Sequence, residues 1–271
     1  MCKTLRLLFV CLIALLPAAC ANWNFYSDEQ LEPLSLQAYE EASNEHGLIK
    51  EGPQYEMVQR VAKRIAAASE EDFRWEARLL KADDTPNAFC LPNGRIAIYT
   101  GILPITKNED GLAIVMGHEV AHAVLRHGGK RMTQSTITSA GLVAVEAGLG
   151  LAEMEGEAKA GVMAALGVGA QVAVLLPYSR DHESEADIEG LRYAIRAGYK
   201  PEEAPLLWER MAKLGGGKTP QWLSTHPEPE ARAQKLREMI PVIKEQEKDW
   251  KPKPKAAQAP TKQVDPGAIK K

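Results

Sequence analysis

The 271-residue chain lacks an excess of positive charge. Its 33 Lys and Arg residues are outnumbered by 36 Asp and Glu residues, which leaves a formal net charge of −3 at pH 7. Nucleic-acid-binding surfaces are built from clustered Lys and Arg, so this composition gives no reason to expect a nucleic-acid partner. The chain also has only four cysteines, which excludes a disulfide scaffold in a protein of this size.

A hydrophobic run long enough to cross a bilayer is missing as well. Crossing takes about 20 apolar residues. Residues 7–16 form a shorter run, and the small-residue stretch 137–176 is interrupted by charges such as Glu146 and Glu155. This stretch predicts a helical hairpin, with contact to a lipid surface as the alternative. With 45% hydrophobic and 25% charged residues, the chain has the composition of a globular protein, which excludes wholesale disorder and a multi-span membrane protein.

The first twenty residues have the order of a secretory signal. Lys3 and Arg6 precede the apolar run Leu7–Leu16, and small residues follow as far as Cys20. A signal that ends in cysteine resembles that of a bacterial lipoprotein. The resemblance implies that residues 1–19 are removed and that Cys20 becomes the first, lipid-bearing residue of the mature chain.

A lipid on Cys20 would decide where the protein resides. More than one acyl chain gives a stable membrane anchor, so we expect a periplasmic protein held on a Gram-negative membrane. Ala21 follows the cysteine where an Asp would retain the protein at the inner membrane, and similarity to enterobacterial sorting signals then implies the outer membrane. Without a lipid, Cys20 could instead form a disulfide with Cys90 in this oxidising compartment.

Hydrophobic periodicity predicts a mainly helical chain with a small sheet. A lead-in over residues 20–50 holds one short helix, and the Lys- and Pro-rich residues 241–271 predict a disordered tail. A turn at Pro92–Gly94 suggests a hairpin. We expect strands over residues 74–80 and 96–100, and helices over residues 54–69, 108–127, 181–197, 201–214 and 229–240. The fold class is therefore α+β, predominantly α.

The segment HEVAH at residues 118–122 lies inside one of these helices. A spacing of four places His118 and His122 on the same helical face, one above the other. Two imidazoles in this arrangement can hold one Zn²⁺ at about 2.0–2.1 Å. Glu119 projects about 100° around the helix and can reach a water on the metal. The pattern is therefore typical of a hydrolytic zinc site.

A catalytic zinc usually has three protein ligands and one open position, so a third ligand is needed. Residues 179–187 offer several, and spacing alone does not choose among them. Glu183 and Asp187 share a helix face, so one could bind the metal while the other orients a ligand imidazole. The candidates for the third ligand are Asp181, His182, Glu183 and Glu185.

The HExxH segment is followed about sixty residues later by the ExxxD segment ESEAD at residues 183–187. This combination resembles the M48 family of zinc metallopeptidases, in its Oma1-like and bacterial lipoprotein branch. The similarity spans residues 51–240, which we take as the peptidase domain. Further matches lie at residues 87–89, 96–101 and 224–227 and at Arg232, whereas Cys90 and Asn93 depart from the usual residues.

The resemblance assigns a role to each residue of the expected zinc site. It implies a zincin-like fold with one Zn²⁺ per chain, held by His118, His122 and Glu183. Glu119 would be the general base, and Asp187 would orient one of the ligand imidazoles from behind.

The resemblance also implies a small sheet whose edge strand lies beside the zinc helix and binds an extended substrate as a further strand. Such pairing uses backbone hydrogen bonds and tolerates many side chains, so unfolded or misassembled envelope proteins are the expected substrates. The residues assigned to this edge strand are Ile96, Ala97, Ile98 and Tyr99.

Two downstream residues have open roles. By resemblance, His226 is a latch that fills the open metal position; the alternatives are a histidine that holds a loop and a hydrogen-bond donor to the transition state. Arg232 either supports the oxyanion or a loop, or is an ordinary charge on a helix face. Two further histidines are expected to stay outside the site. His127 lies five residues after His122, a spacing that predicts a surface position for His127. His182 is expected to turn away from Glu183, its neighbour on the helix.

Two functions compete with a zinc endopeptidase. One is a latent assembly factor or chaperone-like lipoprotein that only binds extended chains at its edge strand. Such a module would have no need of Glu119, so the complete set of residues argues against it. The other is metal storage or sensing, which would favour more thiolate or imidazole ligands than the chain offers.

Overall fold

The computed structural model describes residues 23–134, 136–137, 179–214, 221–226 and 229–252. The predicted signal segment and Cys20 lie outside the described residues, as do all but the first residue of the expected hairpin at 137–176 and the end of the tail. Within the described part, no helix combines the length and the apolar character needed to cross a membrane.

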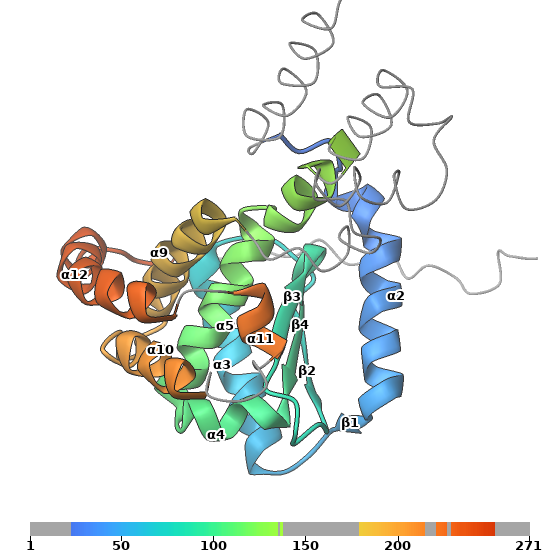
Figure 1. The fold of residues 1–271 in the computed structure, drawn as a ribbon, viewed down its shortest axis with the longest axis horizontal. Helices are drawn as coiled ribbons and strands as arrows, with labels where there is room; N and C mark the ends of the chain where they lie inside the picture. Colours follow the sequence, from blue (N-terminus) through green and yellow to red (C-terminus); the bar gives the residue numbers. More distant parts are fainter. Residues whose placement is uncertain (1–22, 135, 138–178, 215–220, 227–228, 253–271) are drawn as a thin grey trace, which may run out of the picture.

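The described chain is mostly helical with one small sheet, which confirms the predicted fold class (Figure 1). The helices are α2 (Asp28–His46), α3 (Pro53–Ser69), α4 (Leu103–Thr106), α5 (Glu109–Val124), α9 (Arg180–Arg196), α10 (Glu203–Lys213), α11 (Gln221–Thr225) and α12 (Pro229–Glu247). The strands are β1 (Leu48–Ile49), β2 (Glu76–Leu80), β3 (Ala88–Leu91) and β4 (Arg95–Tyr99), and the short 3₁₀ turns are η1 (Pro92–Gly94) and η2 (Thr100–Ile102).

The strand order β1-β2-β4-β3 corrects the expected edge strand. Ile96, Ala97, Ile98 and Tyr99 belong to β4, which lies inside the sheet between a parallel partner, β2, and an antiparallel partner, β3. All five residues of β4 are buried, as suits an apolar strand covered on both faces. The turn at η1 folds β3 back along β4, so the edge strand on this side of the sheet is the four-residue strand β3, which the sequence pattern did not predict.

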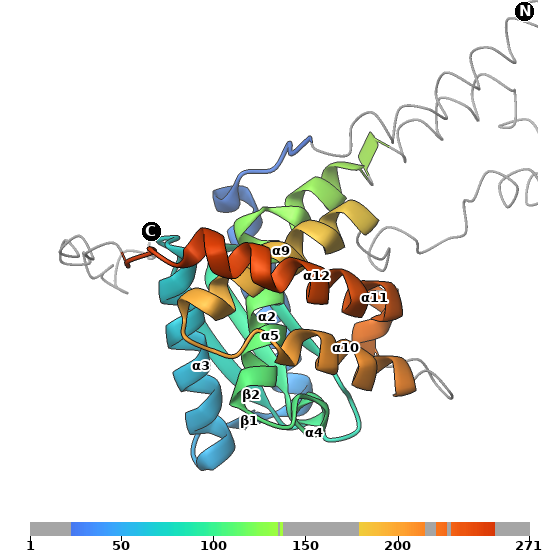
Figure 2. The same cartoon turned by 90° about the vertical axis from the view of Figure 1, so that its left-hand side faces the viewer.

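Helices cover both faces of the sheet (Figure 1). On one face α2 packs through Tyr39, whose hydroxyl donates to the carbonyl oxygen of Ile96 at 2.9 Å. On the other face α3 and α5 bury the main hydrophobic core against the strands. Helices α9, α10 and α12 form a further layer outside α5 (Figure 2). Helix α5, which carries the HEVAH segment, is therefore enclosed between the sheet and this outer layer.

Helices α5 and α9 meet backbone to backbone at two glycines. A Cβ built on Gly117 would lie 2.6 Å from the carbonyl oxygen of Gly190, and a Cβ on Gly190 would lie 2.6 Å from the backbone nitrogen of His118. Any larger side chain would push the helices apart. The contact brings the ExxxD segment of α9 next to the HExxH segment of α5.

The last helix is longer than expected. It continues through Pro241 to Glu247, so the tail does not begin at residue 241. Proline within a helix removes one backbone hydrogen bond, and tertiary contacts offset this cost. Ile243 is fully buried, and the carboxylate of Glu247 accepts a hydrogen bond from Arg196 at 2.6 Å. The composition predicted disorder here because it does not record these contacts.

The buried end of α12 yields a stability prediction. We expect Ile243→Ala to lower the free energy of unfolding by about 2–5 kcal/mol, because it deletes a fully buried side chain. Val242 is 45% exposed, and we expect Val242→Ala to change the free energy by no more than about 0.5 kcal/mol. Urea unfolding of both variants measures the difference. Equally small effects would mean that residues after 240 are not part of the core.

Candidate metal centre

Three elements supply the side chains of the expected zinc site. Helix α5 contributes the HEVAH segment, and its first turn is capped by Asn108, whose side chain accepts from the backbone nitrogen of Gly111 at 2.8 Å. Helix α9 begins at the cap Ser179 and contributes Glu183 and Asp187. His226 follows directly after α11.

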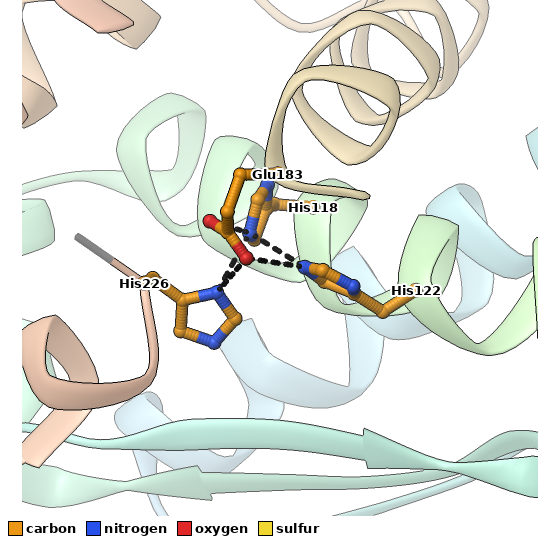
Figure 3. A group of neighbouring side chains, drawn as sticks. All are labelled: His118, His122, Glu183 and His226. Atoms are coloured by element: carbon orange, nitrogen blue, oxygen red, sulfur yellow. Dashed lines mark hydrogen bonds and ion pairs between the residues drawn. The ribbon is translucent and has the colours of Figure 1, made fainter. Parts of the chain in front are cut away.

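The structure gathers four donor groups at one point (Figure 3). His118, His122, Glu183 and His226 each offer one ligand atom, and these atoms all lie within 4.8 Å of one another. The Nε2 atoms of His118 and His122 are 3.0 Å apart, and His226 Nδ1 lies 2.9 Å from Glu183 Oε1. All four residues are at most 3% exposed. Of the four candidates for the third ligand, only Glu183 joins this group.

The spacing of the donors fits a small tetrahedral cation. Ligands at about 2.0–2.1 Å from a tetrahedral Zn²⁺ lie about 3.3–3.4 Å from one another. The separations of Nε2 of His122 from Glu183 Oε1 (3.3 Å) and of His118 Nε2 from His226 Nδ1 (3.1 Å) are close to this value. Imidazole and carboxylate are ligands that zinc accepts. The donor set therefore fits a zinc ion, with His226 as an additional, fourth donor.

Arg232 lies behind the carboxylates. Its guanidinium donates to Glu183 Oε2 at 2.5 Å and to both oxygens of Asp187 at 2.5 and 2.7 Å, and it stacks over Trp208 at 3.5 Å. Burial alone would raise the pKa of Asp187, but Arg232 and His118 hold this pKa below its usual value. Arg232 therefore keeps the buried acids ionised and in place.

Asp187 also touches a ligand histidine. One of its carboxylate oxygens lies 3.2 Å from Nδ1 of His118, which leaves the Nε2 atom of this imidazole directed at the donor cluster. This is the arrangement in which a carboxylate fixes the tautomer of a metal-binding histidine. Asp187 therefore lies where it can orient the imidazole of His118.

The charges of the cluster suit a divalent cation. Burial would raise the pKa of Glu183, but His226, His118 and His122 hold it well below its usual range, so the group is ionised. Burial lowers the pKa of His122 well below its ordinary value, which leaves a neutral imidazole with a free lone pair. Burial and Arg232 disfavour the charged form of His118, but Asp187 and Glu183 outweigh them and raise its pKa to about 9. A bound cation would replace the proton on His118.

The candidate base Glu119 has partners that the sequence did not reveal. The indole Nε1 of Trp222 donates to Glu119 Oε1 at 2.6 Å, and His226 Nε2 lies 3.5 Å from the same oxygen. Trp222 is buried and stacks on Trp208 with ring centroids 4.9 Å apart. No motif marks Trp222, since it is a lone aromatic residue about a hundred positions from Glu119 along the chain.

The prediction that His127 lies at the surface is wrong. His127 is fully buried, and its Nδ1 lies 2.9 Å from Nδ1 of His122. The prediction assumed an unbroken helix, whereas α5 ends at Val124 and Arg126 has a φ of 56°. His182 is also buried, and its ring stacks on that of His127 at 4.3 Å. Neither histidine is part of the four-residue donor cluster.

The hydrogen-bond roles around His127 follow from chemistry. A metal-binding His122 uses the Nε2 lone pair, so its Nδ1 carries the proton and donates to Nδ1 of His127. His127 then carries its own proton on Nε2, which lies 3.0 Å from Glu185 Oε2. Burial lowers the pKa of His127 to about 4, which suits this neutral form. His127 thus supports His122 as Asp187 supports His118.

Comparison with known proteins identifies the family. A model of peptidase family M48 matches residues 51–240. The chain belongs to this family. The match confirms the family inferred from the HEVAH and ESEAD motifs, and it means that the donor cluster lies within a metallopeptidase domain.

Curated relatives include mitochondrial and bacterial peptidases of this family. Mitochondrial metalloendopeptidase OMA1 of Schizosaccharomyces pombe is 37% identical over 214 residues, which cover 77% of this chain and 60% of that protein. Metalloprotease YcaL of Escherichia coli is 31% identical over 154 residues, or 57% and 58% of the two chains. The putative beta-barrel assembly-enhancing protease of Vibrio cholerae is 33% identical over 159 residues, or 58% and 33%. The matched part is thus less than two thirds of each relative's length.

The contact between His127 and His122 yields a prediction about metal affinity. We expect His127→Phe to weaken zinc binding about 10- to 100-fold, because the ring remains while the acceptor for His122 Nδ1–H is lost. Competition with a chromophoric chelator measures the affinity, and far-UV circular dichroism of the metal-free protein checks the fold. His46 lies outside the cluster, so His46→Phe is the control. Equal zinc affinity in both variants would show that His127 only fills space.

Proposed function

We propose that this protein is a zinc-dependent endopeptidase. One observation carries the proposal, namely the buried cluster of His118, His122 and Glu183 beside the carboxylate of Glu119. His226 Nδ1 lies 3.1 Å from Nε2 of His118, while its Nε2 lies 3.5 Å from Glu119 Oε1. Glu119 is therefore within reach of a small molecule bound where the imidazole of His226 now sits. Membership of family M48 supports the same reaction class.

The roles of the chain's own groups follow from their positions. His118, His122 and Glu183 would hold the zinc. When bound, zinc lowers the pKa of a coordinated water to about 7 and polarises a peptide carbonyl. Glu119 takes the proton of the attacking water and returns it to the leaving amine. Trp222 holds one oxygen of Glu119 through its indole N–H, which leaves the other oxygen for this proton.

The substrate is proposed to be an extended chain of an unfolded or misassembled envelope protein. Of the two edge strands of the described sheet, β1 and β3, the one that lies against α5 is β3. Strand β3 packs closely against α5, so a chain added to this edge would pass beside the donor cluster. A bacterial relative carries the name of an assembly-enhancing protease, which supports an envelope substrate.

His226 favours a second, related function. Its Nδ1 atom completes a four-donor set, and four protein ligands are typical of closed, structural zinc sites. We therefore propose that this conformation is a latent one, in which His226 occupies the position that a water would need. A protein that remained in this state would act as a chaperone-like lipoprotein that binds extended chains without cutting them.

We propose further that the protein is periplasmic and is held by a lipid on Cys20, in the outer membrane of a Gram-negative bacterium. The proposal rests on the signal-like residues 1–20 and on Ala21. Cys90 is buried in β3, which does not favour the alternative disulfide with Cys20. Relatives of bacterial origin are compatible with this location.

The general-base role of Glu119 leads to the first functional prediction. Glu119→Gln should reduce cleavage of unfolded casein by about 10²- to 10⁴-fold, because the amide takes up no proton. Its oxygen can still accept the indole N–H of Trp222, so zinc content should be unchanged. Both proteins are also assayed with His226→Ala added, to remove the latch. Equal cleavage with and without Glu119, or no cleavage by any of them, would refute the endopeptidase.

The latch is tested by His226→Ala in the otherwise unchanged chain. A latch predicts faster cleavage of casein, since the variant frees the fourth position, and zinc should still bind through the remaining three ligands. His182 is also buried but outside the cluster, so His182→Ala serves as the control. Loss of cleavage in His226→Ala alone would instead assign His226 as a transition-state donor.

The lipid is tested by metabolic labelling with a radioactive fatty acid. Label should enter the protein in cells and should be absent from Cys20→Ser, because no other cysteine remains near the mature N-terminus. Membrane fractionation of both forms shows whether the lipid holds the protein. Label that persists in Cys20→Ser would exclude this anchor.

A further inference from the structure

A hollow of the described chain lies beside the donor cluster. It is a cavity of about 160 Å³ between α2, the end of α5, the helical residues 127–134 and the end of β3. His122, one of the clustered donors, forms part of its wall together with Cys90 and Leu91 of β3. The cavity therefore adjoins both the centre and the open edge of the sheet.

The register of β3 shows how a bound chain would meet this cavity. The backbone N–H of Tyr99 donates to the carbonyl oxygen of Asn87 at 3.1 Å. Along an antiparallel strand, residues whose backbone groups face the partner strand alternate with residues whose backbone groups face away. Because Asn87 faces β4, the N–H and C=O of Cys90, three residues later, point away from β4. A chain paired there would lie along the outer side of β3, from α11 at Pro86 to the cavity at Leu91.

Side chains of an added strand would point alternately to the two faces of the sheet. On one face lies α5 with the donor cluster, and on the other lies α2. The cavity reaches around the edge between these faces, since residues of both helices line it. A residue close to the scissile bond would therefore place its side chain in the cavity.

The lining is mainly apolar. Two arginines are also present, and one of them, Arg126, pairs with Asp28 at 3.1 Å. A cavity of about 150 Å³ with apolar walls is large enough to hold benzene, so this one can accept a leucine or phenylalanine side chain. The apolar contributors are Leu31, Leu34, Leu91, Pro92, Ala123 and Met132.

We infer that this cavity is a specificity pocket for one large apolar side chain of the extended substrate, next to the bond that is cut. The inference rests on the proposed function, because it takes the donor cluster as the reaction centre. It adds a substrate class, namely extended chains that expose a large apolar residue such as Leu or Phe.

Gly128 allows the pocket to be filled without strain. It lines the cavity, and a Cβ built on it would meet nothing within 4 Å. It lies in the helical segment 127–134, where leucine is a better helix former than glycine. Leu34 and Leu36 form a matched pair on α2, because they are 54% and 45% exposed and only Leu34 is part of the cavity wall.

The experiment measures peptide binding to the zinc-loaded full-length chain with Glu119→Gln and His226→Ala, so that peptides are not cut and the latch is removed. A fluorescent extended peptide is varied at one position at a time among Ala, Leu, Phe and Asp, and Kd is read by anisotropy. At one position, we expect the peptide with Leu or Phe to bind at least about 10-fold more tightly than the peptide with Ala, because apolar pockets typically discriminate between side chains of different size by this factor.

Adding Gly128→Leu should abolish this preference while the Kd of the Ala peptide stays the same within about 2-fold, since only the pocket is filled. Leu34→Ala should weaken the preference, and Leu36→Ala should leave it unchanged. The inference is overturned if no position prefers an apolar residue, if Asp binds best, or if the preference survives Gly128→Leu. The casein assay is separate, so a chain that shows the preference but never cleaves would contradict only the proposed function.

Discussion

The direct contact between α5 and α9 is the constraint on which the site depends. Gly117 and Gly190 let the two backbones touch, and only at this separation does Glu183 reach His118 and His122. The contact buries a carboxylate among imidazoles, and buried charges are costly unless they are paired or bind a metal. Arg232 supplies part of the compensation, and a divalent cation would supply the rest. The close packing of α5 and α9 thus also determines which charges are buried in the site.

Each reactive group is held from behind by a second residue. Asp187 orients His118, His127 orients His122, and Trp222 holds Glu119. These supports differ in charge, since the first is an anion, the second a neutral imidazole and the third a neutral indole. Each of these groups therefore has a buried partner that restricts its orientation. On the side of α11, a single imidazole, His226, is the fourth member of the donor cluster, and the proposed latch would open the site by moving this imidazole alone.

The proposed binding surface would combine one part that tolerates many side chains with one part that distinguishes them. Strand β3 offers backbone groups, which pair with any extended chain, whereas the cavity beside His122 can distinguish one side chain from another by its size and polarity. A peptidase built in this way would accept many sequences and would still favour chains that expose apolar residues. Folded proteins keep such residues in their cores, so the proposed combination would select for unfolded substrates.

The sequence alone was sufficient for the family, the helical class and the HExxH and ExxxD residues, because these depend on spacing within single helices. The edge strand, the length of α12 and the burial of His127 needed the tertiary structure. Whether β3 or β4 lies outside is decided by the turn at Pro92–Gly94 and by pairing with β2, and α12 continues through Pro241 because Ile243 and Glu247 find partners on other helices. Likewise, Trp222 and the cavity arise where segments distant in the chain meet, and local patterns carry no record of such contacts.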